Sequence, residues 1–246
     1  MGQNLLESLL PKICAVETYD DKYLKSKKVC AKITVLCWGD GMKEEQETRE
    51  RLLKSAEKEF REKGYTKASL RKICSQAGVT TGALYFFFQD KEDLFGALVE
   101  EPIKGVYEIL YRHFDEESEM LSQPSSYVHT DGDHDRFAEA LVRHLYDNYD
   151  AFLLLLKKSQ GCRYESFIDD VTAFLEKRYL AFMTHYAKEQ DLPAPNAFFV
   201  HLIIHISIDL QVQLLLYERD VEKAVAMQKR WMDFIVGGCM KLVFSK

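Results

Sequence analysis

The most constraining feature of this sequence is a run of three helix-forming segments that follow one another closely near the N-terminus. From Thr48 apolar residues recur at helical spacing, and Gly64 follows as a left-handed stop signal. Ser69 is a suitable N-cap for LRKICSQA, and Thr80 is a suitable N-cap for TGALYFFF, after a tight turn at Gly78. Two short helices joined at a glycine turn and braced by a longer one predict a helix-turn-helix.

The same run carries a resemblance to a known family. The segment TRERLLKSAEKEFREKGYTKASLRKICSQAGVTTGALYFFFQDKEDLF resembles the DNA-binding domain of tetracycline-repressor (TetR) type regulators. It keeps the order and spacing of a GYxxxS/T step, an AGV turn, a G-x-LY element and a closing F-xx-KE-xL. The resemblance covers about one-fifth of the chain. It implies a DNA-binding domain followed by an all-helical domain that dimerises and binds a small ligand.

The third helix is expected to read DNA. Its spacing turns Leu84 and Phe88 inward and leaves Thr81, Gly82 and Tyr85 on the outer side. The match to the family motif implies further contacts to phosphates at both borders of the interface. The predicted DNA-binding residues are Ser69, Arg71, Thr80, Thr81, Gly82, Tyr85, Phe86, Phe87 and Lys91.

The sequence departs from the family pattern at three of these positions. Family members usually carry a basic or polar residue at the position of Thr81, and Tyr or His at the positions of Phe86 and Phe87. Phenylalanine has no group that donates a hydrogen bond, so the phosphate contacts of the family are absent at these two positions. The recognition helix also has no charged side chain. We expect specificity to depend on backbone positioning and apolar contact, with weaker affinity than a basic helix would give.

Charge is distributed in a way that fits local DNA binding. Residues 43–91 hold eleven Lys and Arg against eight Asp and Glu, a net charge of +3. Residues 92–246 carry −10, within a total of −6 for the whole chain. The basic part therefore coincides with the motif, and the acidic remainder disfavours non-specific wrapping of DNA.

Three regions are expected, and the fold class is all-α. Residues 1–41 form an N-terminal extension, 42–91 the helix-turn-helix domain, and 92–246 the helical ligand-binding and dimerisation domain. A helix from Lys91 towards Phe114 is expected to kink at Pro102. A polar connection (115–135) is followed by helices at about 136–158, 164–190, 195–218 and 220–244. A near-heptad apolar stripe in the last helix, taken with the family resemblance, predicts a homodimer through the last two helices.

The extension has two interpretations. Its run KVCAKITVLCW resembles a β-strand and does not continue into the helical pattern that follows. Met42 is a plausible natural start, in which case the four residues just before it, Trp38 to Gly41, are a translated ribosome-binding site. The alternative is a genuine extension packed as a short hairpin. On the first interpretation residues 1–41 are dispensable.

A pocket for an effector is expected between the middle helices, lined by aromatic side chains. Single aromatic residues at helical spacing also belong to ordinary cores, which is the competing interpretation. The candidates are Tyr107, Tyr111, Phe114, His144, Phe152, Tyr164, Phe167, Phe174 and His185.

No enzymatic or metal chemistry is expected. His201, His205 and Asp209 share one helix face at i, i+4 and i+8, but a fourth ligand is not in view, so hydrogen bonding is favoured over a metal. No nucleophile constellation, phosphate loop or dinucleotide glycine pattern is present in the sequence. We expect no cofactor and no catalytic residues.

The remaining features favour a cytoplasmic protein. The six cysteines show no CxxC pair, and the first residues lack the pattern of a secretion signal. The most apolar stretch, Ala197 to Ile208, is interrupted by two histidines, so no membrane span is expected. The expected function is a regulator, a repressor released from double-stranded operator DNA by a small-molecule effector. The alternative is a helical dimeric binding or scaffold protein that has lost operator recognition.

Overall fold

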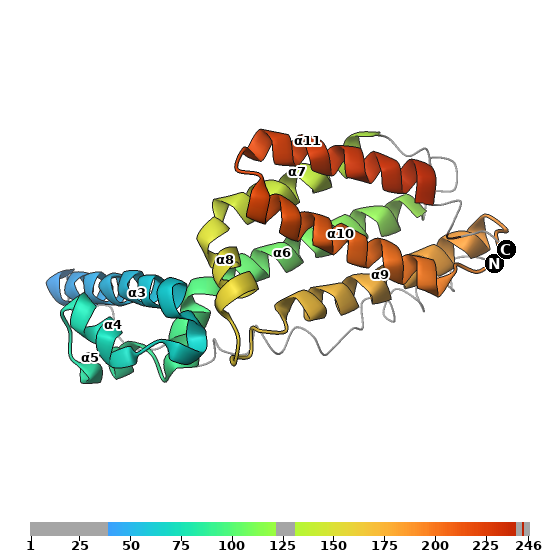
Figure 1. The fold of residues 1–246 in the computed structure, drawn as a ribbon. Coiled ribbons are helices and arrows are strands. Elements are labelled where there is room, and N and C mark those ends of the chain that lie inside the picture. Colours follow the sequence, from blue (N-terminus) through green and yellow to red (C-terminus); the bar gives the residue numbers. More distant parts are fainter. Residues whose placement is uncertain (1–38, 122–130, 240–242, 244–246) are drawn as a thin grey trace. The chain divides into compact units, whose positions relative to one another are not determined.

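The structure, a computed structural model, describes residues 39–121, 131–239 and 243, and every element in these ranges is a helix (Figure 1). The predicted all-α fold class is confirmed. The chain divides into two compact units, Met1–Glu44 and Glu45–Lys246. The β-like run of the extension lies outside the described residues. The description below concerns the second unit.

The first three described helices form the predicted helix-turn-helix. They are α3 (Gly39–Lys67), α4 (Leu70–Ala77) and α5 (Thr81–Phe87). The helical path of α3 is interrupted at Gly64, whose φ of 73° lies in the left-handed region that glycine tolerates. The predicted stop at this residue is therefore confirmed, although a short helical turn follows it.

A small apolar core holds these helices together. Leu52, Ala56 and Phe60 of α3 are fully buried, as the apolar stripe predicts. Ile73 and Leu84 add one fully buried side chain from each of the two short helices. The inward faces of α4 and α5 are therefore apolar, and the polar side chains of α4 remain on its outer side.

Helix α6 (Lys91–Leu121) leads from this core into the larger group of helices. Asp90 caps it, because Oδ1 accepts a hydrogen bond from the amide of Asp93 at 2.8 Å. In return Oδ2 of Asp93 accepts from the amide of Gln89 at 2.9 Å. The helix continues across Pro102, at which the missing N–H removes one backbone hydrogen bond.

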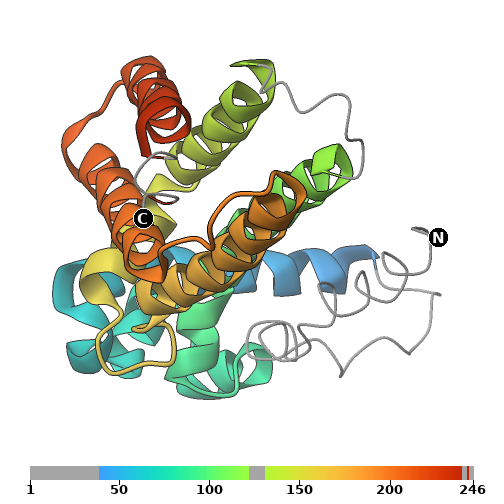
Figure 2. The same cartoon turned by 90° about the vertical axis from the view of Figure 1, so that its right-hand side faces the viewer.

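The remaining helices are α7 (Asp131–Asp147), α8 (Tyr149–Lys158), α9 (Phe167–Glu189), α10 (Ala197–Tyr217) and α11 (Val221–Phe234), with a π-helical turn at Ile235–Cys239 (Figure 2). Two predictions about them were wrong in detail. The polar connection is shorter than expected, because α6 and α7 extend into it from either side and polar composition alone does not end a helix. The single helix expected over 136–158 is broken at Asn148, whose side chain donates to the carbonyl oxygen of His144.

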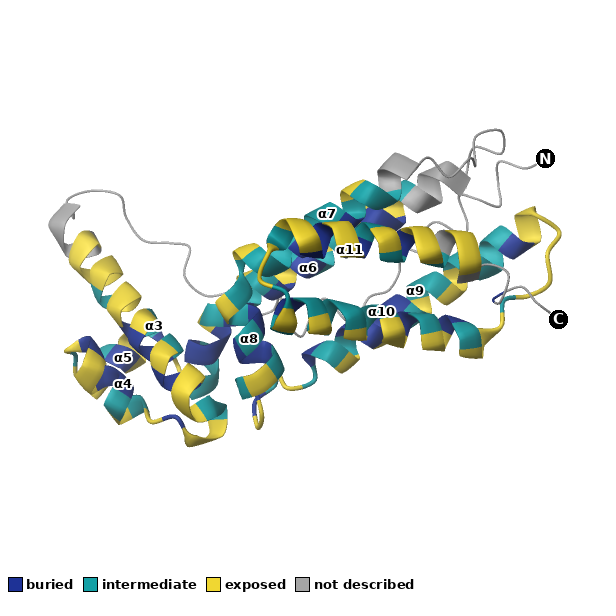
Figure 3. Ribbon diagram, turned by 45° about the horizontal axis from the view of Figure 1, so that its top comes forward, coloured by how far each residue is buried: buried dark blue, intermediate teal, exposed yellow. Residues whose placement is uncertain are grey.

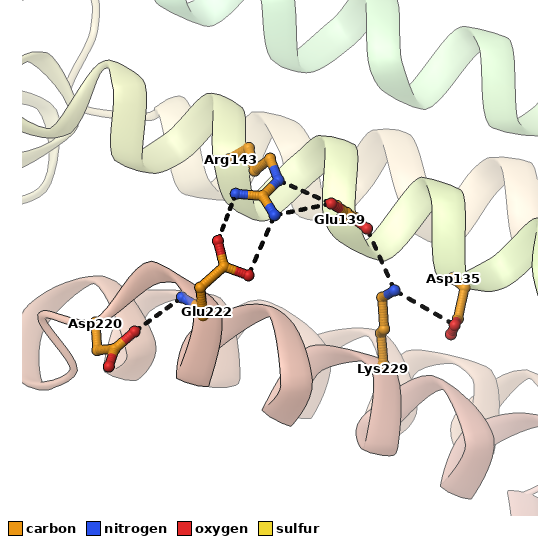
Figure 4. Close-up of polar contacts among 6 residues, drawn as sticks. All are labelled: Asp135, Glu139, Arg143, Asp220, Glu222 and Lys229. Carbon is orange, nitrogen blue, oxygen red and sulfur yellow. Dashed lines mark hydrogen bonds and ion pairs between the residues drawn. The ribbon is translucent and has the colours of Figure 1, made fainter.

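Helix α11 is bound to α7 by an apolar cluster and a row of ion pairs. Val142, Ala224 and Val225 form the buried cluster. Beside it, Arg143 of α7 contacts Glu222 of α11 at 2.9 Å, and Lys229 of α11 reaches back to Glu139 at 3.3 Å (Figure 4). Arg143 and Lys229 together hold the pKa of the Glu139 carboxyl below its usual range.

Helix α10 is unusually apolar and exposed. Its mean hydropathy is 1.7 over a window of which 17 % is buried, so by length and composition it passes the test for a membrane span. The expectation of no membrane span was based on a shorter apolar run than this helix has. The apolar run does not end at Ile208 but continues to Tyr217, because the intervening charges are few.

Candidate nucleic-acid interface and internal cavity

Helix α5 is positioned by local hydrogen bonds and by two apolar anchors. The hydroxyl of Thr80 caps it by accepting a hydrogen bond from the amide of Ala83 at 3.1 Å. Gly78, with φ of 68°, makes the left-handed turn that precedes it. Leu84 and Phe88 are 0 % and 3 % exposed, so the predicted inward side of the helix is confirmed.

The outward side of α5 is aromatic and open to solvent. Tyr85 is 57 % and Phe86 71 % exposed. Thr81 and Gly82 are exposed on the first turn, and Phe87 is half-buried with its ring edge against Phe86, 5.0 Å between centroids. Large apolar side chains at such exposure are costly in water unless a partner covers them, so this surface is a candidate contact region.

Helix α4 is held against α3 by a carboxylate that the sequence analysis did not identify. Glu59 is 2 % exposed, and its carboxylate lies 2.5 Å from the ammonium of Lys72. The amide of Ser69 donates to the same carboxylate at 3.4 Å, and the Ser69 hydroxyl caps α4 at Lys72. Hydrogen bonding to Lys72 holds the pKa of Glu59 below its ordinary value. Arg71, by contrast, is exposed at the start of α4.

Lys91, which is predicted to contact a DNA phosphate, also makes contacts within the chain. Its Nζ lies 3.3 Å from the carbonyl oxygen of Thr66 and 4.5 Å from the ring centroid of Tyr65. A cation over an aromatic face is stabilised in place. The predicted phosphate contact at this residue therefore competes with a local structural role.

The loop between α8 and α9 contacts both the helix-turn-helix and the start of α6. The Thr66 hydroxyl donates to the carbonyl oxygen of Gln160 at 2.7 Å, and the amide of Arg163 donates to Glu92 at 2.8 Å. Further along α6, the Arg163 guanidinium contacts Glu100 at 2.7 Å. These bonds connect the helix-turn-helix to the rest of the unit in addition to the continuous helix α6.

A cavity of about 80 Å³ lies among α6, α7, α8, α9 and α10. Its lining is apolar except for one amide, Gln211, which donates to the buried side chain of Gln228 on α11. The lining residues are Val106, Leu110, Leu141, Leu145, Phe152, Leu156, Phe167, Ile168, Val171, Leu175, Ile208, Gln211, Val212 and Leu215. The expected position between the middle helices agrees with this cavity, but its walls are mainly aliphatic.

Only two of the nine predicted pocket residues, Phe152 and Phe167, line this cavity. Four others pack on one another beside it in an aromatic cluster of α6 and α9, with the Arg178 guanidinium 5.4 Å from the Tyr111 ring centroid. These four are Tyr107, Tyr111, Phe114 and Phe174.

The last three pocket candidates are separate. Tyr164 is fully buried against the first turns of α6, and His185 is half-buried on α9. His144 donates from Nε2 to the carbonyl oxygen of Pro102 at 2.8 Å, and its ring covers Gly105. None of the three lines the cavity described above.

Comparison with known proteins agrees with the helix-turn-helix. Residues 52–98 match the family described as "Bacterial regulatory proteins, tetR family". Over 56 residues the chain is 46 % identical to "HTH-type transcriptional repressor BepR" of Brucella suis biovar 1 (strain 1330), covering 23 % of this chain and 27 % of that protein. Over 57 residues it is 46 % identical to "HTH-type transcriptional regulator AcrR" of Shigella flexneri, covering 23 % and 26 %. The match thus spans about a quarter of the length of these relatives.

The fold likeness extends further than the sequence likeness. The crystal structure of the TetR family transcriptional regulator PfmR from Thermus thermophilus aligns with 77 % of this chain and 96 % of its own, with a TM-score of 0.54 and 20 % identity. At this identity the likeness shows a shared fold. The chain therefore carries a helix-turn-helix that matches the tetR family model, within a fold shared with a TetR family regulator.

Proposed function

We propose that this protein is a dimeric, cytoplasmic transcriptional regulator, a repressor that binds operator DNA and leaves it when a small effector binds. The observation that carries the proposal is the exposed face of α5, held outward by the buried Leu84 and Phe88 within a TetR-type domain. The similar proteins compared above are named as transcriptional regulators. They therefore favour a regulator over an enzyme.

The chemistry of α5 fits apolar readout of the major groove. Gly82 has no side chain, so the backbone can approach the duplex closely, and Thr81 is small enough to reach a base edge. Phe86 can contact thymine methyl groups or sugars, and the Tyr85 hydroxyl can donate to a phosphate. The flanking cation Arg71 supplies attraction to phosphate that α5 lacks.

Dimerisation through α10 and α11 accounts for the exposed apolar surface of these helices. Figure 3 shows much of their outer sides as exposed. Large apolar side chains lie there, among them Leu202 and Ile206 of α10 and Met227 of α11, 40–47 % exposed. A second copy would cover them in a four-helix bundle. A bilayer fits less well, because Asp209 lies within α10 and a charged side chain near the bilayer centre costs about 3 kcal/mol or more.

The cavity favours an uncharged, lipophilic effector, since its lining contains a single polar side chain. Its volume of about 80 Å³ is well below the ~300–1,000 Å³ of typical ligand pockets, so an effector must push the helices apart. Val106 and Leu110 transmit that displacement to α6, which begins in contact with the helix-turn-helix. The effector weakens DNA binding only to the extent that it binds the displaced arrangement of helices more tightly than the original one.

Selection of binding sequences from a random duplex library, using the full chain, tests the proposal. We expect an enriched site with two half-sites about 10 base pairs apart or a multiple of this, because two recognition helices enter successive major grooves. Affinity for that site should fall steeply with salt. The Tyr85→Ala and Leu202→Glu variants should both lose this binding, the second by yielding a monomer in sedimentation.

Two results would contradict the proposal. A library that yields no enriched sequence, with a folded dimer in sedimentation, would favour the scaffold alternative. An enriched site that Tyr85→Ala binds as well as the unaltered protein would exclude α5 as the reading helix.

A further inference from the structure

Three metal-ligating side chains meet on the solvent-exposed side of α9 and α10. Glu176 comes from α9, and His201 and His205 come from consecutive turns of α10. The Glu176 Oε1 lies 2.7 Å from Nδ1 of His201 and 3.2 Å from Nε2 of His205. One ligand atom from each residue lies within 4.8 Å of the other two.

The local structure explains why the two histidines converge. Asn196 caps α10 by accepting hydrogen bonds from the amides of Phe198 and Phe199, which fixes the first turn of the helix. His201 and His205 are then four residues apart on one face, with ring centroids separated by 4.2 Å. Because α9 packs along α10, Glu176 is brought to the same face.

We propose that Glu176, His201 and His205 form a binding site for a divalent transition metal, Zn²⁺ first among them. Zinc in proteins takes imidazole nitrogen and carboxylate oxygen ligands at about 2.0–2.2 Å in tetrahedral geometry, which places neighbouring ligand atoms about 3.3–3.5 Å apart. The Glu176–His205 separation of 3.2 Å is close to that requirement. The Glu176–His201 separation of 2.7 Å is about 0.6 Å short of it, so the half-exposed His201 ring must move outward by that amount to admit a metal. Half-exposed histidines leave a fourth position open to water.

The two rings lie 4.2 Å apart between centroids and face the same carboxylate oxygen. Imidazole binds a metal through a ring-nitrogen lone pair, so both rings can point one at a metal that also neutralises Glu176. The bound metal would cross-link α9 and α10 beside Leu202 and Ile206, at the edge of the exposed apolar surface.

Asp209 does not belong to this site. The sequence spacing groups it with His201 and His205, but its Oδ1 accepts from Gln213 one turn further along α10, and it is absent from the ligand cluster. The third ligand is instead supplied by another helix. Asp209→Asn is therefore a matched control, since it removes a carboxylate from the same helix one turn beyond His205.

Calorimetric titration of the tag-free, chelator-treated full chain with ZnCl₂ tests the site. We expect one zinc per chain and a thermal midpoint that rises with zinc concentration, because a ligand that binds only the folded state stabilises it. Co²⁺ in place of Zn²⁺ should give the visible absorption of a four-coordinate ion. His205→Gln and Glu176→Gln should each weaken binding at least tenfold, while Asp209→Asn should bind like the unaltered protein.

The variants carry the same cysteines, so zinc held by thiolates would appear equally in all of them. Equal affinity in His205→Gln and in the unaltered protein would overturn the proposal, as would a thermal midpoint that zinc does not change. Circular dichroism of each variant without metal checks that a lost affinity is not a lost fold. No DNA is used, so the outcome is independent of the proposed regulatory function.

Discussion

Tyr164 donates a hydrogen bond from its hydroxyl to Oε1 of Glu100 at 2.5 Å, which joins the loop after α8 to the helix that leaves the helix-turn-helix. Burial, and then the adjacent Glu100 carboxylate, raise the pKa of Tyr164, so its hydroxyl remains a donor at any physiological pH. The contact is possible because Gly96, one turn before Glu100, has no side chain. It adds to the bonds that hold the loop after α8 against the first turns of α6.

Substitution of Gly96 by alanine should therefore destabilise the protein. The added Cβ would lie 2.2 Å from the Tyr164 hydroxyl and 3.0 Å from Glu100 Oε1, so the ring must move. We expect a loss of about 1–3 kcal/mol in the free energy of unfolding, measured with urea. Tyr164→Phe in the Gly96→Ala background should restore part of it by removing the clashing oxygen. No loss on Gly96→Ala would show that the Tyr164 ring is not packed against Gly96.

Gly82→Ala should have the opposite effect on stability. Nothing lies closer than 3.7 Å to its added Cβ, and alanine in a helix is favoured over glycine by about 0.5–1 kcal/mol. The same methyl group stands on the outer side of α5 and would hold the backbone away from a duplex. We expect a higher thermal midpoint together with weaker binding to the selected DNA site. Unchanged affinity would argue against close backbone approach at this residue.

Stability should decrease as the pH falls below about 6.5, because of His113. Burial, with a smaller contribution from the nearby His134, lowers the pKa of His113 from 6.5 to about 3. Between these values the unfolded chain takes up a proton that the folded chain excludes, so this group reduces stability by up to ~1.4 kcal/mol for each pH unit lost. Urea unfolding at pH 7 and pH 5 measures this slope.

A variant pair isolates that effect. His113→Phe keeps a ring stacked on Phe137, 4.0 Å away between centroids, and removes the ionisable group, so its slope should be shallower. Phe137→Leu disturbs the same stack but keeps the histidine, so it should lower stability without flattening the slope. Equal slopes in His113→Phe and the unaltered protein would contradict the assignment.

Arg71→Ala should weaken binding to all DNA sequences by a similar factor. Its exposed guanidinium is predicted to contact phosphate, so its removal should reduce the slope of log affinity against log salt by about one. Lys177→Ala removes an exposed cation from α9 and should leave the slope unchanged. A reduced slope in both variants would point to long-range charge and not to a phosphate contact. Fluorescence anisotropy across a series of salt concentrations is sufficient to measure this.

The helix boundaries of the DNA-reading domain could be predicted because their causes are local. Ser69, Thr80 and Asp90 each accept an amide hydrogen bond within three residues, and Gly78 makes its left-handed turn without help from distant parts of the chain. The inward side of α5 followed from helical periodicity alone. Resemblance to the TetR family supplied the expected DNA-contacting residues, which remain predictions.

The tertiary structure alone decided which side chains from different helices lie together. Periodicity states which residues share a face of one helix, but the rotation and offset of neighbouring helices depend on how all their side chains pack. Phe152 and Phe167 line the cavity while Phe174 packs beside it, although all three are aromatic residues at helical spacing. Glu59 is buried because Lys72 neutralises it, and Glu176 joins two histidines that the sequence groups with Asp209. These contacts join residues that are many positions apart in the sequence, so no local pattern in the chain predicts them.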